Sequence, residues 1–352
     1  MDLVILAVSF VIILVGAELF TNGIEWFGHK MNLAEGAVGS VLAAVGTALP
    51  ETMIPIVAIL FSSSGNQEAS DAVGVGAILG APFMLATLAM FVTGLAVLSQ
   101  ARRRPAGDVM PVDSDVLGKD IRYFSVAYGL AVAVAFVPSE FGWVKPAAAV
   151  LLLVIYALYV KAHFEADPNV DAVDLAPLRF NRLDRSREDG DPQGPRLRVV
   201  SLQVVAALAL IIAGAVAFVG AVEHLAEVVG INPAILALVV APIATELPEK
   251  FNSIIWVRQG KDTLAMGNIT GAMVFQSCIP TVVALLFAGS SWAVTEDSLI
   301  SFASAGIAFL STAAIFLPMI RRGRLNGRGL LIGGLFYAIY LGLVVLSLTG
   351  VL

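Results

Sequence analysis

Charged residues are scarce in this sequence. Asp, Glu, Lys and Arg make up only 14% of the 352 residues, whereas hydrophobic residues make up 58% and the mean hydropathy is +0.89. Soluble domains carry about 25% charged residues, so the composition excludes a water-soluble globular protein. Apolar runs such as 3–20 and 199–222 match the ~20 residues that cross a bilayer. The composition therefore predicts an all-α integral membrane protein.

Residues and motifs that support catalysis or redox chemistry are also few. The single cysteine, Cys278, excludes an intrachain disulfide and a cysteine-based metal cluster. The three histidines show no metal-ligand spacing, and no phosphate-binding loop, dinucleotide glycine pattern or Ser-His-Asp set is usefully placed. We therefore expect no enzyme, no tightly bound cofactor and no nucleic-acid partner. The residues indicate no oligomeric state.

Apolar segments separated by polar clusters predict ten membrane-spanning helices. The first follows Met1 and Asp2 without a basic segment, so we expect a retained helix rather than a cleaved signal. The expected bounds are 2–20, 34–62, 71–98, 122–139, 144–163, 199–221, 232–257, 262–289, 298–319 and 329–350.

Lysine and arginine are distributed unevenly over the loops. When the loops are assigned alternately to two sides, one side receives nearly all of these residues and the other receives only Lys145. The positive-inside rule then predicts a multi-pass inner-membrane protein with both termini outside the cytoplasm. The longest loop, 164–198, is rich in Asp, Arg, Pro and Gly and is expected to be a mobile cytoplasmic linker.

The two halves of the chain resemble each other. A shift of 198 positions superposes Gly16 on Gly214, Glu25 on Glu223, Thr47 on Thr245 and Leu49-Pro50-Glu51 on Leu247-Pro248-Glu249. The pattern predicts two five-helix repeats, residues 1–163 and 199–352. Because five is odd, the second repeat enters the membrane from the opposite side. Such inverted repeats place a binding site near the middle of the membrane, where they meet.

Each Leu-Pro-Glu segment places a carboxylate deep within an apolar span. A charged group at this depth costs ~2.5–3.5 kcal/mol, and each proline removes a helical hydrogen bond and leaves a carbonyl beside the glutamate. Carboxylate and carbonyl oxygens are ligands for hard cations. The sequence therefore predicts a cation site with Glu51 and Glu249 as the metal ligands. A purely structural hydrogen bond is the alternative, and the repetition of the motif argues against it.

Four further polar residues are weaker candidates for the same site. Thr47 and Thr245 stand one turn before the glutamates, where their hydroxyl groups could bind a cation or could bond back to the preceding helical turn. Asn268 could be a ligand or could form a hydrogen bond between helices. Gln276, further along the same span, is a secondary candidate.

Glu246 and Lys250 distinguish the second Leu-Pro-Glu segment from the first. They stand four residues apart, a spacing at which Glu and Lys form an ion pair on a helix. One interpretation is a fixed structural pair. The other is proton coupling, because two carboxylates close together, here Glu246 and Glu249, raise the pKa of one of them. The sequence leaves both open.

The paired segments Gly-Thr-Ala-Leu-Pro-Glu (46–51) and Ala-Thr-Glu-Leu-Pro-Glu (244–249), with Gly-Asn-Ile-Thr-Gly (267–271), resemble the calcium/cation antiporter superfamily, close to prokaryotic sodium/calcium exchangers. The resemblance covers nearly the whole chain. It implies two inverted five-helix repeats and a site at mid-membrane that binds Ca²⁺ and Na⁺. By matching positions, Glu51, Glu249, Thr47 and Thr245 are expected to bind the cation.

The sequence also departs from this family. Ala48 and Glu246 stand where the family has serine, and Ala81-Pro82 and Ala272-Met273 stand where it has Ser-Asn or Ser-Asp. The site thus lacks several expected oxygen ligands. We expect a secondary antiporter that exchanges Ca²⁺ for Na⁺ or H⁺ by alternating access. The alternatives are a monovalent cation/proton antiporter and, in a different class, a passive cation channel.

Overall fold

The computed structural model describes residues 2–30, 45, 48–61, 67–164, 176–183, 195–231, 235, 237, 247–258, 260 and 262–349. These residues are helical except for turns, short connections and one antiparallel pairing of β1 (Val109–Met110) with β2 (Leu325–Asn326). Among them, seven helices are long and apolar enough to cross a membrane, and Glu51–Phe61 forms a shorter apolar helix. The predicted all-α membrane fold is confirmed at this level.

The helices follow the order of the predicted spans. They are α1 (Asp2–Lys30), α4 (Leu49–Phe61), α5 (Gln67–Met84), the π-helix η2 (Leu85–Ala89), α6 (Met90–Gln100), α7 (Ser114–Val134), α8 (Val144–Phe164), α9 (Leu197–Val229), α11 (Leu247–Arg258), α12 (Asp262–Phe287), α13 (Leu299–Arg322), α14 (Gly327–Leu330) and α15 (Ile332–Leu348). Short 3₁₀ turns lie at η3 (Ser139–Phe141) and η4 (Arg179–Leu183).

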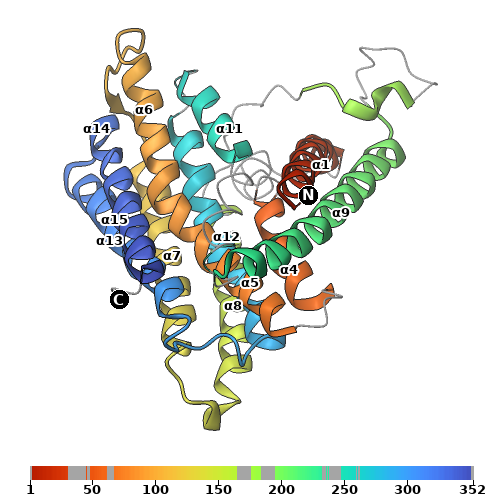
Figure 1. The fold of residues 1–352 in the computed structure, drawn as a ribbon. Helices are drawn as coiled ribbons and strands as arrows, with labels where there is room; N and C mark the ends of the chain where they lie inside the picture. Colours follow the sequence, from red (N-terminus) through yellow and green to blue (C-terminus); the bar gives the residue numbers. More distant parts are fainter. Residues whose placement is uncertain are drawn as a thin grey trace.

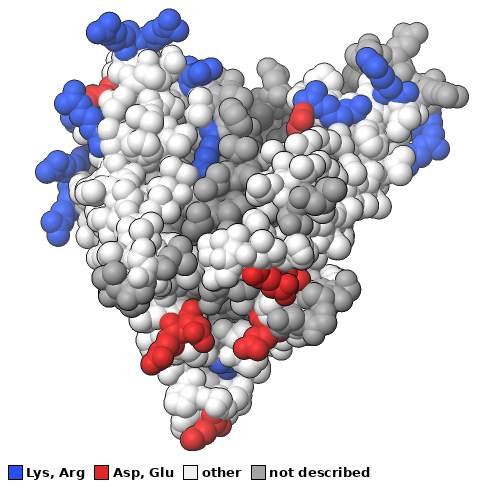
Figure 2. All heavy atoms as spheres, viewed as in Figure 1, with Lys and Arg blue, Asp and Glu red and all other residues white. Residues whose placement is uncertain are grey.

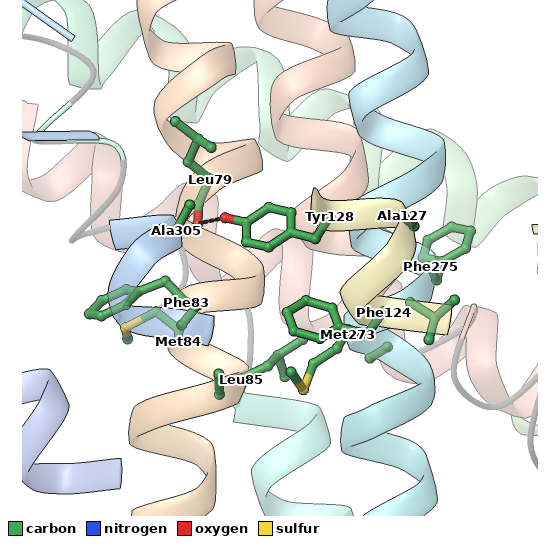
Figure 3. Close-up of a cluster of buried hydrophobic side chains, with 14 of the residues drawn as sticks. Leu79, Phe83, Met84, Leu85, Phe124, Ala127, Tyr128, Met273, Phe275 and Ala305 are labelled. Carbon is green, nitrogen blue, oxygen red and sulfur yellow. Dashed lines mark hydrogen bonds between the residues drawn. The ribbon is translucent and has the colours of Figure 1, made fainter. Parts of the chain in front are cut away.

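The described helices form two packed groups that meet at the centre. α1 and α9 lie side by side on one flank, α13, α14 and α15 form the opposite flank, and α5 and α12 lie between them (Figure 1). The larger hydrophobic core joins α5, η2, α7, α8, α12, α13 and α15, and a smaller one joins α1, α4, α5 and α9. Figure 3 shows part of the larger core, in which the Tyr128 hydroxyl donates to the Leu79 carbonyl at 3.3 Å.

Two glycines allow α1 and α9 to pack closely. A Cβ atom at Gly16 would lie 2.8 Å from Cγ1 of Ile211, and a Cβ at Gly214 would lie 2.7 Å from Cγ1 of Ile13. Small residues at such crossings let membrane helices approach each other. The contact is reciprocal: each glycine meets the isoleucine three positions before the other glycine, and the same shift of 198 positions (13 to 211, 16 to 214) relates the two pairs.

Several helices are longer than the predicted spans. α1 continues past residue 20 to Lys30, and α9 continues past 221 until Gly230, in a left-handed conformation with φ of 70°, ends it. α7 begins at Ser114 rather than 122, because the Asp113 side chain accepts from the backbone N–H groups of residues 115 and 116 at 2.8 and 3.1 Å. Hydropathy measures the apolar part of a helix and misses the turns that extend beyond it.

Part of the predicted linker is bound to the helices. Asn22 of α1 accepts from the backbone N–H of Arg179 at 3.0 Å, and Gln203 of α9 accepts from that of Phe180 at 2.8 Å. The Gln203 amide also donates to Asn22 at 3.0 Å, and Trp26 donates to the Ala176 carbonyl at 2.9 Å. Residues 176–183 are thus an ordered segment on α1 and α9, and the expected mobility is wrong for them.

A buried ion pair holds the N-terminal end of α12 in place. One terminal nitrogen of Arg104 donates to Asp262 at 2.8 Å and to the Val257 carbonyl at 2.7 Å, and the other also contacts the carboxylate. Both side chains are almost fully buried. Breaking such a pair by removing one partner costs about 3–5 kcal/mol because a charge is left buried. The end of α6 is therefore tied to the turn between α11 and α12.

We predict that Gly333→Ala destabilises the protein. A Cβ atom at Gly333 would lie 2.4 Å from the Thr87 carbonyl oxygen in η2, so α15 would have to move away at a cost of about 1–3 kcal/mol. The control is Gly342→Ala in the same helix, where a Cβ meets no described atom within 4 Å. Thermal unfolding in detergent should show a lower Tm for Gly333→Ala alone. Equal Tm values for the two variants would contradict the close contact.

Candidate functional site

The candidate site is built at the start of α4. Ala48 lies in a turn and α4 begins at Leu49, so Pro50 and Glu51 occupy its first turn. Proline is tolerated there because its missing N–H would have no helical partner. The partial positive charge of a helix N-terminus also stabilises a carboxylate in the first turn. The sequence predicted a proline break within a long span, and the structure begins a helix at that point.

The second Leu-Pro-Glu segment also lies in a helix, at the start of its described part. α11 begins at Leu247, which puts Pro248 and Glu249 in its first turn. The side chain of Glu249 lies outside the description, as do Thr47, Thr245 and Glu246 entirely. The predicted roles of these four residues stay predictions.

Gln276 connects α12 to the first Leu-Pro-Glu segment. Its side-chain amide donates to the Ala48 carbonyl at 3.0 Å, and the Thr52 hydroxyl donates to the same carbonyl at 2.8 Å. Gln276 is 1% exposed, Thr52 4% and Glu51 5%. A helix from the second half of the chain therefore lies against the buried glutamate of the first half. The sequence ranked Gln276 as a secondary candidate because nothing in it reveals a contact 228 positions away.

Asn268 and Lys250 are also buried. Asn268 lies on α12 and Lys250 on α11, and these two helices pack against each other. A buried lysine requires compensation by a partner or loss of its proton. Both sequence interpretations of Lys250, a fixed pair and proton coupling, are consistent with this burial.

Apolar side chains stand at the positions where the family has oxygen ligands, and they are buried in the structure. Ala48 and Ala81 are each 1% exposed, and Ala272 and Met273 are fully buried. No side-chain oxygen is available at these four positions to bind a cation. Carboxylates, the Thr47 and Thr245 hydroxyl groups, backbone carbonyls, the Asn268 and Gln276 amides and water remain as possible ligands.

A buried cluster of polar side chains lies around Asp120, outside the Leu-Pro-Glu segments. Asp120 of α7 accepts from Thr270 of α12 at 2.5 Å and from Tyr159 of α8 at 3.1 Å, and Nε2 of His163 lies 3.0 Å from it. Nδ1 of His163 lies 3.2 Å from the Tyr159 carbonyl. Both ring nitrogens of His163 thus lie within hydrogen-bond distance of an oxygen atom. The sequence missed this cluster because Asp120 stands just before an expected span and its partners are distant in the chain.

Family comparison decides the class of protein. A family model described as "Sodium/calcium exchanger protein" matches residues 1–164 and 200–349, nearly the whole chain outside the linker. The chain belongs to this family. The match confirms the predicted resemblance and the expectation of an integral membrane transporter rather than an enzyme. The exchanger family also confirms cation antiport as the general activity, without deciding the ions.

Individual relatives have low sequence identity to this exchanger but align with most of its length. The CaxA protein of Alkalimonas amylolytica, which is named as an antiporter, is 23% identical over 327 residues, with 91% of this chain and 90% of the relative aligned. The membrane protein MJ0091 of Methanocaldococcus jannaschii is 20% identical over 261 residues, 74% of this chain and 73% of the relative.

Solved structures share the fold of the exchanger. A crystal structure of the H⁺/Ca²⁺ exchanger CAX matches 99% of this chain and 87% of its own, with a TM-score of 0.74 and 16% identity. A structure of the sodium-calcium exchanger NCX_Mj matches 97% of both chains, with a TM-score of 0.56 and 15% identity. At these identities the likeness concerns the fold alone.

We predict that Gln276→Met weakens cation transport more than it weakens folding. Methionine has a similar volume but cannot donate to the Ala48 carbonyl, so the cost in stability is about 1 kcal/mol. The position of the Leu-Pro-Glu segment also loses its support, and we expect the KM for the cation to rise about tenfold or more. Flux into proteoliposomes and thermal unfolding measure the two effects.

Ser277→Ala is the matched control for this prediction. The Ser277 hydroxyl donates to the Met273 carbonyl of its own helix at 2.7 Å and, among the described residues, forms no hydrogen bond to another helix. Its removal should leave the KM unchanged. A normal KM for Gln276→Met would show that the contact with Ala48 has no part in cation binding.

Proposed function

We propose that this exchanger is a secondary active antiporter that moves Ca²⁺ across the inner membrane in exchange for H⁺ by alternating access. Glu51 and Glu249 bind the Ca²⁺ ion. One observation carries the proposal: Glu51 is only 5% exposed. It lies at the start of α4, which the Gln276 hydrogen bond holds against α12. Burying a carboxylate in an apolar span is costly, and a divalent cation that binds there supplies a compensating charge.

The scarcity of oxygen ligands favours H⁺ over Na⁺ as the counter-ion. Several bound Na⁺ ions would each need oxygen atoms in addition to those that bind Ca²⁺, and Ala48, Ala81, Ala272 and Met273 supply none from their side chains. Protons need only the two carboxylates that Ca²⁺ leaves.

The reciprocal contact of α1 and α9 supports the proposal of two inverted repeats, and so of ten membrane-spanning helices. The Gly16–Ile211 and Gly214–Ile13 contacts exchange equivalent residues, as a two-fold axis between the helices requires. The proposed repeats are residues 1–163 and 199–352, joined by the linker 164–198.

The charge distribution supports a membrane orientation with both termini outside the cytoplasm. On the face that Figure 2 shows, lysine and arginine gather at one end of the molecule, and most of the visible acidic side chains lie toward the other. The exception, Lys145, donates to the Gly289 carbonyl just after the end of α12 at 2.5 Å. A cation near a helix C-terminus is favourable. Lys145 thus has a structural role and does not weaken the topology inferred from the other basic residues.

The first experiment measures exchange by the purified protein in proteoliposomes. We predict that a pH gradient drives uptake of ⁴⁵Ca²⁺ and that Glu51→Gln and Glu249→Gln each reduce the apparent Ca²⁺ affinity by at least about 100-fold, because each removes a direct charged ligand. Glu68→Gln is the control, since Glu68 is exposed in the first turn of α5. Wild-type transport by both site variants would show that the cation binds elsewhere.

The same vesicles distinguish the alternative functions. Ca²⁺ uptake driven by a Na⁺ gradient, but not by a pH gradient, would make Na⁺ the counter-ion. Exchange of Na⁺ or K⁺ for H⁺ without Ca²⁺ movement would indicate a monovalent cation/proton antiporter. Ca²⁺ flux that needs neither counter-ion would indicate a passive channel.

Lys250→Met tests whether the buried lysine takes part in proton coupling. If Lys250 titrates during transport, its removal should flatten the dependence of Ca²⁺ uptake on pH while Ca²⁺ still binds. If it forms a fixed ion pair with Glu246, the variant should lower the Tm in detergent by an amount that corresponds to about 3–5 kcal/mol, with an unchanged pH profile. The double variant Glu246→Gln/Lys250→Met should then recover part of that stability.

A further inference from the structure

A cavity opens at the basic end of α13, away from the candidate cation site. It has a volume of about 440 Å³ and lies between α13, β2 and α14. Its floor is apolar, formed by Ile315, Pro318 and Met319, and two arginines, Arg322 and Arg324, line its edge. Ile315 and Met319 are buried and both arginines are exposed. The cavity thus combines an apolar interior with two cationic groups at the surface.

The backbone places the two arginines on different elements beside the cavity. Arg322 is the last residue of α13, and Gly323 ends the helix with a φ of 64°. The chain then reverses through Arg324 into β2, whose Asn326 pairs with Val109 of β1. A residue with a side chain is strained at this φ, so the glycine is needed for the turn. Both guanidinium groups can therefore approach one ligand.

The charges of these arginines are not used within the described part of the protein. Arg104 pairs with Asp262, and Arg328 pairs with Asp108 at 3.3 Å. Among the described residues, neither Arg322 nor Arg324 forms an ion pair. An anionic ligand would supply the missing counter-charge, and guanidinium groups bind phosphate through paired hydrogen bonds.

The cavity lies at a membrane boundary. α13 is a membrane-spanning candidate that ends at Arg322. On the same helix Leu310 is 61% exposed, Leu317 50% and Ile320 54%, so an exposed apolar surface runs along α13 beside the face that lines the cavity. The surrounding end of the molecule carries many basic side chains (Figure 2). The two arginines, the apolar floor of the cavity and the exposed apolar surface of α13 together fit a ligand with an anionic head and an apolar tail.

We propose that this cavity binds the headgroup of an anionic phospholipid. The phosphate lies between Arg322 and Arg324, the glycerol region contacts the apolar floor, and the acyl chains follow the exposed face of α13. Basic pockets between membrane helices bind anionic lipid headgroups in this way. A free phosphate ion would use the arginines alone and would leave the apolar floor without a partner.

Native mass spectrometry of the full-length protein in detergent tests this proposal. Phosphatidylglycerol and phosphatidylcholine of equal chain length are titrated, and the ratio of their Kd values is the readout. We expect Arg322→Gln/Arg324→Gln to reduce the preference for phosphatidylglycerol about 30-fold, because the loss of each arginine reduces it about fivefold. Arg102→Gln/Arg103→Gln is the matched control, because it removes two exposed charges from the end of α6 at the same end of the molecule.

A second pair of variants tests the cavity itself and keeps both arginines. Gly329 lines the cavity, and a Cβ there meets no described atom within 4 Å, so Gly329→Leu adds bulk at the cavity from a position with open space at the Cβ. Gly306→Leu adds the same bulk at an exposed position of α13 that does not line the cavity. We expect Gly329→Leu to lose the preference for phosphatidylglycerol and Gly306→Leu to keep it.

Inorganic phosphate distinguishes a lipid from a free anion. Millimolar phosphate should leave bound phosphatidylglycerol in place, because it lacks the contacts with the floor. Displacement of the lipid by phosphate, an equal loss of preference in the Arg102/Arg103 control, or full preference in Gly329→Leu would each overturn the proposal.

Discussion

The structure depends on one constraint: a helix that begins within the membrane must have its polar backbone groups satisfied by protein, since lipid offers no hydrogen bonds. α4 begins at a comparably buried point, where Ala48 is 1% exposed, Thr52 4% and Glu51 5%. Pro50 removes one N–H that would need a partner, and the Ala48 carbonyl receives the Thr52 amide at 3.2 Å, the Thr52 hydroxyl and the Gln276 amide. The helix start therefore requires α12 beside it. The same contact that makes the backbone break tolerable also brings the two halves of the chain together around Glu51.

The anchoring of α12 shows which parts of the exchanger are held together. At its basic end the Arg104–Asp262 pair ties it to α6, and the Asp120 cluster ties it to α7 and α8. α1 and α9, by contrast, are tied chiefly to each other, through glycines and through the segment 176–183. In the proposed alternating-access cycle, the α1–α9 pair and the helices around α12 are the natural moving bodies, because few polar contacts among the described residues cross between them.

Hydropathy was enough to predict the order of the described helices and the burial of Glu51, because the cost of a charge in an apolar span is visible in a single residue. The ends of the helices were less predictable. α1 and α9 continue as helices beyond the apolar run, and the Asp113 cap extends α7. Gln276 and Asp120 were underestimated or missed for another reason: their partners are more than 30 positions away in the chain, and no local pattern encodes such contacts. The docking of residues 176–183 was unpredictable for the same reason.

The two halves of the proposed site are unequal, and this has a consequence for the transport cycle. If the two inverted repeats were identical, the two-fold axis would convert the inward-open state into the outward-open state. The two states would then be equal in free energy. Here Thr52 corresponds to the buried Lys250, and Pro55, which cannot donate to the Glu51 carbonyl, corresponds to Ser253, whose hydroxyl donates to the Ala265 carbonyl at 3.1 Å. A tenfold difference in population needs only ~1.4 kcal/mol, which one or two buried hydrogen bonds can supply. The residues that make the site lopsided are therefore sufficient to set which side of the membrane the empty site faces.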